Sequence, residues 1–296
     1  MPGPESGGEP VRRRRVLRAA HITDVHITPE HRAPEGFAAC LRDIQKLDDP
    51  VDLILNTGDS VMCVNGVDRT SAQTQWDLFT RVLADNNAKP VVHCLGNHDV
   101  YQMGRACRGE SLQDGGPSPG KAWAVEALRM PDRYFRAERG GWAFLSLDGI
   151  GCHGGGYTAR LDEAQFAWLE TQLRELPPTT PVCILTHIPI VTACGYFDGD
   201  RVKDNDWVVP GSWMHVDARR LKDLFLKHRN VRLCLSGHMH QLDRIEFNGV
   251  WYCCSGAVSA SWWKGLYYEC GYGYGLLDFY SDGGFDWSYR VFPWPL

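Results

Sequence analysis

The first two thirds of the chain repeat one order of elements: a short apolar run, a polar loop and a segment with helical spacing of apolar residues. The apolar runs are rich in β-branched residues and predict buried strands. They occupy residues 16–27, 51–56, 90–95, 142–147, 181–185 and 231–235. Apolar residues spaced three and four apart predict helices at residues 34–47, 70–84, 121–130, 161–176 and 217–228. This alternation is typical of βαβ units and predicts a largely parallel sheet.

The pattern changes after residue 240, where four further runs predict strands that pair antiparallel across short turns. These runs are residues 244–247, 250–254, 275–280 and 285–292, with turns at Asn248-Gly249 and Asp282-Gly283-Gly284. We therefore expect a single domain over residues 16–296, in which residues 244–296 form a mainly β C-terminal part of its second sheet. Residues 1–15 begin with a stretch rich in Pro, Gly and Glu and are expected to be a disordered extension.

Polar side chains follow the apolar runs at the points where the predicted strands end. A buried strand delivers such residues to a loop at the carboxyl edge of the sheet, where α/β folds place their chemistry. The residues are Asp24, His26, Asp59, Asn97, His98, His187, His238 and His240. The Gly96-Asn97-His98-Asp99 loop alone could bind a metal, position a proton donor or form a capped turn. Its repetition at other strand ends favours a shared site.

The spacing of these residues indicates more than one metal ion. In an extended segment Asp24 and His26 lie on one face, as do His238 and His240, so each pair can hold one ion. One zinc ion takes about four ligands, whereas seven candidates are present without His98. The surplus predicts two ions that share a carboxylate. Nitrogen and oxygen ligands without a thiolate favour divalent or trivalent Fe, Mn, Zn, Co or Ni.

Five short blocks carry these residues in a fixed order along the chain. They are His21-Ile22-Thr23-Asp24-Val25-His26, Thr57-Gly58-Asp59, Gly96-Asn97-His98-Asp99, Thr186-His187 and Gly237-His238-Met239-His240. In these blocks the sequence resembles the calcineurin-like metallophosphoesterases, and within them the branch that includes cyclic-nucleotide phosphodiesterases. The resemblance implies an α/β fold, a four-layer αββα sandwich of two mixed β-sheets flanked by helices, with a dinuclear site at the strand ends.

The resemblance also implies a role for each matching residue. One metal would be held by Asp24, His26 and His240, the other by Asn97, His187 and His238, and Asp59 would bridge the two. The implied reaction is phosphoester hydrolysis, in which a hydroxide that bridges the ions attacks phosphorus. His98 would stay off the metals and protonate the leaving oxygen or stabilise the transition state. Asp99 could orient His98 by accepting a hydrogen bond from it.

Composition limits the partners and the location of the protein. A net charge of -5 gives no general attraction to nucleic acid or to anionic membranes. No apolar run reaches about 18 residues, so no membrane span is expected. Of the 11 cysteines, many lie within apolar runs. We expect these to be small core residues of a cytoplasmic protein, namely Cys94, Cys183, Cys234, Cys253 and Cys254. The sequence leaves the oligomeric state open, a dimer included.

The expected function is hydrolysis of a phosphodiester in a small nucleotide-like substrate. A phosphomonoesterase or a phosphoprotein phosphatase would use the same ligands, because specificity lies in loops that the motifs do not describe. We expect the residues that determine substrate specificity to lie in residues 104–120 and 192–214. A catalytically silent phosphatase-like scaffold is the alternative of another class, and the complete ligand set argues against it. The aromatic segment that begins at Trp262 and Trp263 could contact substrate or only pack between the sheets.

Overall fold

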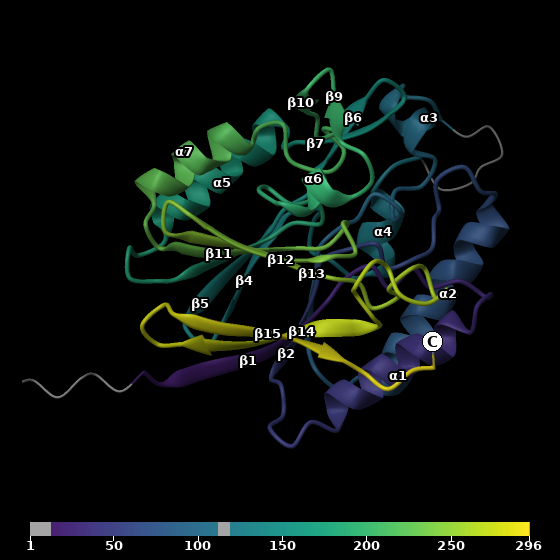
Figure 1. The fold of residues 1–296 in the computed structure, drawn as a ribbon, viewed down its shortest axis with the longest axis horizontal. Helices are drawn as coiled ribbons and strands as arrows, with labels where there is room; N and C mark the ends of the chain where they lie inside the picture. The colour runs from purple at the N-terminus through teal and green to yellow at the C-terminus, as the bar shows by residue number, and fades with distance from the viewer. Residues whose placement is uncertain (1–12, 112–118, 296) are drawn as a thin grey trace, which may run out of the picture.

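The computed structural model describes residues 13–111 and 119–295, which form two large β-sheets with helices on their outer faces (Figure 1). The expected extension over residues 1–15 lies mostly outside the described residues, and Arg15 already belongs to the first strand. The four-layer αββα sandwich expected from the sequence is confirmed.

The first sheet has five strands in the order β15-β14-β1-β2-β3. They are β1 (Arg15–Ile22), β2 (Leu53–Asn56), β3 (Val91–His93), β14 (Gly273–Tyr280) and β15 (Phe285–Val291). The strands β1, β2 and β3 run parallel, and Ile22, Asn56 and His93 lie in register at their ends. Three loops therefore leave this sheet at the same edge.

The second sheet has six strands in the order β12-β13-β11-β8-β5-β4. They are β4 (Phe135–Arg139), β5 (Trp142–Ser146), β8 (Val182–Leu185), β11 (Val231–Ser236), β12 (Leu242–Phe247) and β13 (Val250–Ser255). The four inner strands run parallel, and the edge strands β4 and β12 run antiparallel to them. Leu185 and Leu235 are in register near the ends of β8 and β11, which deliver His187 and His238.

Helices cover the outer faces of both sheets. They are α1 (Ala33–Gln45), α2 (Arg69–Asn86), α4 (Ala122–Ala127), α5 (Glu163–Glu175) and α7 (Ala218–Lys227). The short helices α3 (Met103–Cys107) and α6 (Cys194–Phe197) lie in loops and pack in smaller clusters. Figure 1 shows α5 and α7 on the second sheet and α1 and α2 on the first. None of the helices within the described ranges has both the length and the apolar character that crossing a membrane requires.

The long helices begin at residues that suit a helix start. The side chains of Asp68 and Asp162 accept hydrogen bonds from the backbone amides of Ser71 and Gln165, which caps α2 and α5. In α1 a proline occupies the first turn, where its missing N–H costs least. Local sequence thus sets where these helices begin, in agreement with the predicted ranges.

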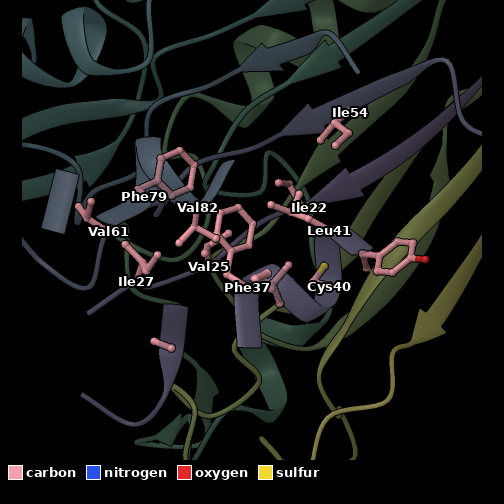
Figure 2. Close-up of a cluster of buried hydrophobic side chains, with 14 of the residues drawn as sticks. Ile22, Val25, Ile27, Phe37, Cys40, Leu41, Ile54, Val61, Phe79 and Val82 are labelled. Atoms are coloured by element: carbon pink, nitrogen blue, oxygen red, sulfur yellow. The ribbon is translucent and has the colours of Figure 1, made fainter. Parts of the chain in front are cut away.

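Apolar side chains fill three layers of core. On the helix side of the first sheet, Phe37 of α1 stacks on Phe79 of α2 with ring centroids 5.3 Å apart (Figure 2). Between the sheets, Leu55, Phe144 and Phe279 are fully buried. Burying one such side chain stabilises the fold by about 1.5–3 kcal/mol. The sheets therefore hold the strand ends rigidly against each other.

The C-terminal strands correct one expectation. Residues 244–296 do not belong to a single sheet, because β12 and β13 extend the second sheet while β14 and β15 complete the first. The chain crosses between the sheets over residues 256–272. The reason is the pairing partner: β14 runs antiparallel to β1, with His21 opposite Gly275, and this long-range pairing is not encoded in local pattern.

Several short elements lie where loops were predicted. The segment after residue 148 forms a hairpin of β6 (Ile150–His153) and β7 (Gly156–Ala159). A second hairpin joins β9 (Val202–Lys203) and β10 (Asp206–Trp207). The edge strand β4 was also not predicted, since charged side chains interrupt its apolar pattern.

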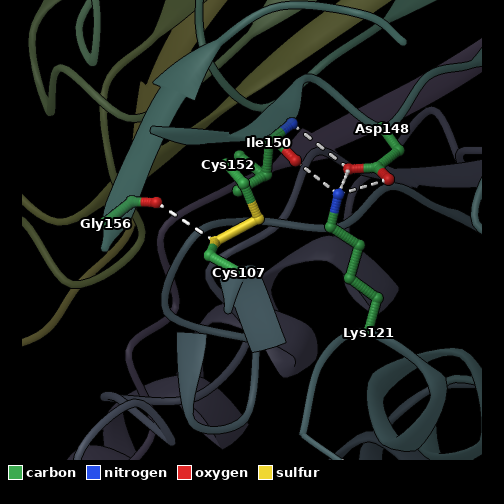
Figure 3. The surroundings of a disulfide bond; sticks show 6 residues. All are labelled: Cys107, Lys121, Asp148, Ile150, Cys152 and Gly156. Atoms are coloured by element: carbon green, nitrogen blue, oxygen red, sulfur yellow. Dashed lines mark hydrogen bonds and ion pairs between the residues drawn. A yellow bond between two sulfur atoms is a disulfide. The ribbon is translucent and has the colours of Figure 1, made fainter. Parts of the chain in front are cut away.

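Two cysteines outside the five expected in the core form a disulfide that the sequence did not predict. Cys107 of α3 and Cys152 of β6 form a disulfide, and beside it the Lys121 ammonium binds the carboxylate of buried Asp148 (Figure 3). The other nine cysteines are free, and eight of them are buried. The five named from the sequence are among these buried thiols, as expected. The disulfide escaped prediction because its partners are 45 residues apart and only the fold brings them together.

We expect the Cys107–Cys152 bond to stabilise the folded state. A disulfide of this loop length contributes about 2–4 kcal/mol, chiefly by restricting the unfolded chain. Cys152→Ser should lower the free energy of unfolding by that amount in urea titrations, and reductant should do the same to the wild type. The matched control is Cys63→Ser, which removes a free, half-buried thiol. Identical unfolding curves with and without reductant would contradict this expectation.

Candidate metal centre

Five loops from both sheets meet at one edge of the sandwich. They follow β1, β2 and β3 of the first sheet and β8 and β11 of the second. They bring together all eight residues singled out at the predicted strand ends: Asp24, His26, Asp59, Asn97, His98, His187, His238 and His240. All but His98 and His238 are buried.

Glycines allow the loops to approach so closely. A Cβ on Gly58 would lie 2.5 Å from the backbone nitrogen of Gly96, and Gly58 also has a φ of +98°. A Cβ on Gly96 would lie 2.1 Å from Asp59 Oδ1, and one on Gly237 would lie 2.3 Å from Asp24 Oδ2. The glycine in each of these motif blocks is therefore required by the neighbouring loop.

The backbone is strained at the same edge. Five of the converging residues adopt left-handed φ angles between 47° and 69°, which side chains with a Cβ rarely adopt. They are Asp24, His26, Asp59, His238 and His240. Such conformations cost of order 1–3 kcal/mol each and are characteristic of functional sites. The fold holds these side chains in directions that an unstrained loop would not give.

The first cluster consists of Asp24, His26 and His240, with one ligand atom from each within 4.8 Å of the others. Thr23 Oγ1 and the backbone N–H of His238 donate to Asp24 Oδ2, at 2.7 and 2.8 Å. The other oxygen, Oδ1, is buried without a hydrogen-bond partner and lies 3.3 Å from His240 Nε2. One carboxylate oxygen is thus fixed while the other faces the cluster.

The second cluster contains Asp59, Asn97, His187 and His238. His187 Nε2 lies 3.2 Å from Asp59 Oδ2, 3.1 Å from Asn97 Oδ1 and 3.2 Å from His238 Nδ1. Asp59 Oδ2 is also 3.6 Å from His26 Nε2, so it lies between the two clusters. This is the position that a bridging carboxylate needs.

The donor set fits cations. His187 donates Nδ1–H to the Thr57 carbonyl, and His240 donates Nδ1–H to the Ala260 carbonyl. In the neutral form each imidazole then presents its Nε2 lone pair to the site, as metal-bound histidines do. His240 Nε2 lies 3.1 Å from His26 Nε2 and 3.3 Å from Asp24 Oδ1, the oxygen that has no hydrogen-bond partner. Electron pairs that converge in this way require positive charge among them.

The pKa values of the histidines and of Asp59 indicate in the same way that the site favours positive charge. Burial lowers the pKa of His26 to about 4 and that of His238 to about 3. Burial also opposes a charge on His187, but the Asp59 carboxylate outweighs it and raises the pKa of His187 to about 9. The pKa of Asp59 is held below its usual range despite burial, because His187 and His98 lie close to it. The carboxylates are therefore ionised and available to bind cations.

His98 lies at the rim of the site. Its side chain keeps 29% of its surface exposed, compared with 2% or less for the side chains of Asp24, His26, Asp59, His187 and His240. Its Nδ1–H donates to the Met62 carbonyl, and its Nε2 lies 3.8 Å from Asp59 Oδ2. Burial opposes its charge, but the Asp59 carboxylate raises the pKa of His98 to about 10. A proton on Nε2 would thus face the site.

Asp99 does not take the position expected for it. Its carboxylate accepts hydrogen bonds from the backbone amides of Ser60, Val61 and Gly96, at 2.9, 3.3 and 2.9 Å. In the described part of the chain, no hydrogen bond joins Asp99 to His98, and the Met62 carbonyl orients that imidazole. Burial and then the Asp59 charge raise the pKa of Asp99 to about 7. Asp99 connects the second and third loops and does not face the reacting groups.

Aromatic rings border the site. Trp262, for which the sequence left substrate contact and packing open, lies against His240 and His26, with ring centroids 4.4 and 5.8 Å apart. Tyr157 of β7 lies 6.3 Å from the His238 ring. The Ala260 carbonyl fixes His240, as noted above. An aromatic segment was visible in the sequence around Trp262, but no local signal distinguishes it from a core strand, and backbone carbonyls carry no sequence signal at all.

Comparison with known proteins agrees with this geometry. Residues 17–242 match the family of calcineurin-like phosphoesterases. The 3',5'-cyclic adenosine monophosphate phosphodiesterase CpdA of Escherichia coli (strain K12) is 29% identical over 242 residues, which cover 79% of this chain and 73% of that protein. The 3',5'-cyclic-nucleotide phosphodiesterase alr5338 of Nostoc sp. (strain PCC 7120) is 23% identical over 297 residues, covering 93% and 91%.

A solved structure shares the fold. A dimetal phosphatase from Danio rerio superposes with a TM-score of 0.61 at 12% identity, covering 95% of this chain and all of that one. The chain belongs to the calcineurin-like phosphoesterase family, because the family match spans most of its length. It is a metal-dependent phosphoester hydrolase, and the resemblance of the motif blocks to this family is confirmed.

We expect Asp59→Asn to weaken binding at both clusters, because an amide has no charge to share between two cations. Protein passed through a desalting column in limiting Mn²⁺ should retain about two ions as wild type and fewer as the variant, measured by plasma mass spectrometry. The control is Asp85→Asn, an exposed carboxylate on α2. Equal metal content in Asp59→Asn and wild type would contradict the assignment of Asp59.

Proposed function

We propose that this protein is a dinuclear phosphodiesterase that hydrolyses a small nucleotide-like phosphoester. The observation that carries the proposal is the pair of electron-rich clusters that share Asp59 Oδ2, at 3.2 Å from His187 Nε2 and 3.6 Å from His26 Nε2. One ion would be held by Asp24, His26 and His240, and the other by Asn97, His187 and His238. Two ions that share a carboxylate supply a nucleophilic water at neutral pH and offset the charge that develops on phosphorus.

The residues around the clusters keep this arrangement ready. The Thr23 hydroxyl and the His238 amide donate hydrogen bonds to Asp24 Oδ2. The Thr57 and Ala260 carbonyls orient the imidazoles of His187 and His240. Partners of this kind fix the direction and tautomer of a ligand. The protein therefore holds the metal-binding side chains in fixed orientations, which the strained loops maintain.

We propose that His98 donates the proton that the leaving oxygen needs. Its Nδ1 is fixed by the Met62 carbonyl, which leaves Nε2 as the group that faces the phosphoester. The Asp59 carboxylate, against the effect of burial, raises the pKa of His98 and so favours a proton on this imidazole. A protonated imidazole at this position can donate to the leaving oxygen or to a phosphoryl oxygen in the transition state.

The names of the relatives favour a diester over a monoester. Both curated relatives described above are named as phosphodiesterases of cyclic nucleotides. A phosphomonoesterase or a phosphoprotein phosphatase would use the same ligands and remains the nearest alternative. A phosphatase-like scaffold without turnover would not need His98 fixed at the rim of an electron-rich site.

The metals and the location follow from the ligand set and the cysteines. Imidazole, carboxylate and amide ligands without thiolate suit Mn, Fe, Zn, Co or Ni. We place the protein in the cytoplasm, because nine of its cysteines are free. The Cys107–Cys152 bond is the observation that opposes this location, since such bonds persist mainly in oxidising compartments.

The first test of this function is turnover of bis(p-nitrophenyl) phosphate by Mn²⁺-loaded protein. Wild type should release p-nitrophenolate, and Asp59→Asn should reduce kcat/KM by at least about 10³-fold, since electrostatic stabilisation by the ions is lost. Asp85→Asn should match wild type. Absence of hydrolysis of mono- and diesters by fully loaded wild type would support the scaffold alternative.

The second test separates His98 from the metal ligands. His98→Ala should lower kcat by about 10² to 10⁴-fold while the metal content stays at the wild-type value. The control is His228→Ala at the end of α7, which lies outside both clusters. If the His98 variant lost one ion, His98 would be a ligand and the assignment would be wrong.

A further inference from the structure

The segment between β13 and β14 crosses the metal edge and is bonded to the loop after β1. Val258 N–H donates to the Thr23 carbonyl, and Ser259 Oγ donates to the Asp24 carbonyl at 2.7 Å. Trp263 Nε1 donates to the Val25 carbonyl at 2.9 Å. The first metal-binding loop and the aromatic segment are therefore joined by several hydrogen bonds.

The two neighbouring tryptophans of this segment have different surroundings. Trp263 is buried, and its ring stacks on Tyr272 and fills the space beside Gly36, where a Cβ would lie 2.3 Å from the indole. Trp262 is half-exposed, and its ring lies 4.4 Å from that of His240 at an interplanar angle of 33°. Trp263 anchors the segment, and Trp262 is held at the edge of the site.

The backbone of this segment is strained. Trp262 and Trp263 both have left-handed φ angles, 50° and 67°, as do Ala260 and Tyr268 in the same segment. Bulky residues rarely adopt this conformation, and the surrounding structure must hold them there. These φ angles place the Trp262 side chain beside the metal ligands and the Trp263 side chain in the core.

Tyr267 lies beside the half-exposed indole, and the rings of Trp262 and Tyr267 together form an aromatic wall. Its ring stands edge-on to Trp262, with centroids 5.5 Å apart and an interplanar angle of 89°. Its hydroxyl donates to Asp198 at 3.1 Å, and the hydroxyl of Tyr268 donates to the same carboxylate. Asp198 thus fixes the wall from the segment after α6, one of the regions expected to carry specificity.

We propose that Trp262 is the stacking platform for the nucleobase of the substrate and so determines its class: phosphoesters with a planar aromatic base. This rests on the proposed function, because the phosphoryl group must sit at the two clusters for its organic group to reach the wall. Trp262 is half-exposed and lies beside two residues of the first cluster, with its ring centroid 5.8 Å from that of His26 and 4.4 Å from that of His240. Tyr157 is the other nearby ring, but it packs into the cluster of Val100, Met103 and Ile150.

Indole offers a π-face to every base, so stacking is strong and tolerant of base identity. The wall predicts little preference among adenine, guanine and pyrimidines, and a clear preference for any of them over a bare sugar phosphate. The class of substrate is therefore set by an aromatic surface, with no hydrogen-bond pattern that would select one base.

The test compares two ligands that differ by the base. Titration calorimetry of Mn²⁺-loaded protein should show that AMP binds more tightly than ribose 5-phosphate. Trp262→Ala and Trp262→Leu should weaken AMP binding by about tenfold or more and leave ribose 5-phosphate within about twofold. Trp262→Phe should retain most of the AMP affinity, because it keeps a π-face. The matched control is Trp168→Ala, a half-buried tryptophan on α5.

Each outcome of this test is decisive. Equal binding of AMP and ribose 5-phosphate by wild type would overturn the proposal, as would equal loss of both ligands in the Trp262 variants, which would show that the indole only supports the metal ligands. Metal content, measured in parallel, should be unchanged in Trp262→Leu. Turnover of bis(p-nitrophenyl) phosphate by wild type tests the proposed function separately, so failure of stacking and failure of the phosphodiesterase assignment are distinguishable.

Discussion

The structure depends on the convergence of electron pairs at one edge of two sheets. Asp24, Asp59 and their histidine partners are brought within a few ångströms of one another, with few protons to separate them. Buried lone pairs and carboxylates repel one another unless positive charge lies among them. The strained φ angles, the glycines at the loop contacts and the rigid cores behind the strands are all consistent with a site that the fold forces together for cations to occupy.

The two sheets supply the rigidity that this convergence needs. Each loop follows a buried parallel strand, and the strands are locked by apolar cores on both faces. Around the site, carbonyls of Thr57, Met62 and Ala260 set the orientation of three imidazoles. Asp99, the last residue of the Gly96–Asp99 block, serves the same purpose by joining backbone amides of two loops. The site is thus positioned largely by main-chain groups.

The metal-binding clusters and the aromatic segment beside them come from different parts of the chain. The strand ends that hold the clusters belong to the family match over residues 17–242, whereas the aromatic segment with Trp262 lies beyond it. That segment is nevertheless bonded to the loop after β1 through Trp263 and Ser259.

The sequence by itself determined most strands of the two large sheets, the main helices and the metal-competent residues, because hydrophobic period and strand-end chemistry are local properties. It could not determine which sheet β14 joins, that Cys107 meets Cys152, or that Trp262 rather than Trp263 lies at the site. It also gave Asp99 a partner that the structure replaces with backbone amides. Those outcomes depend on contacts between residues far apart in the chain and on backbone groups that carry no sequence signal, so only the tertiary structure could decide them.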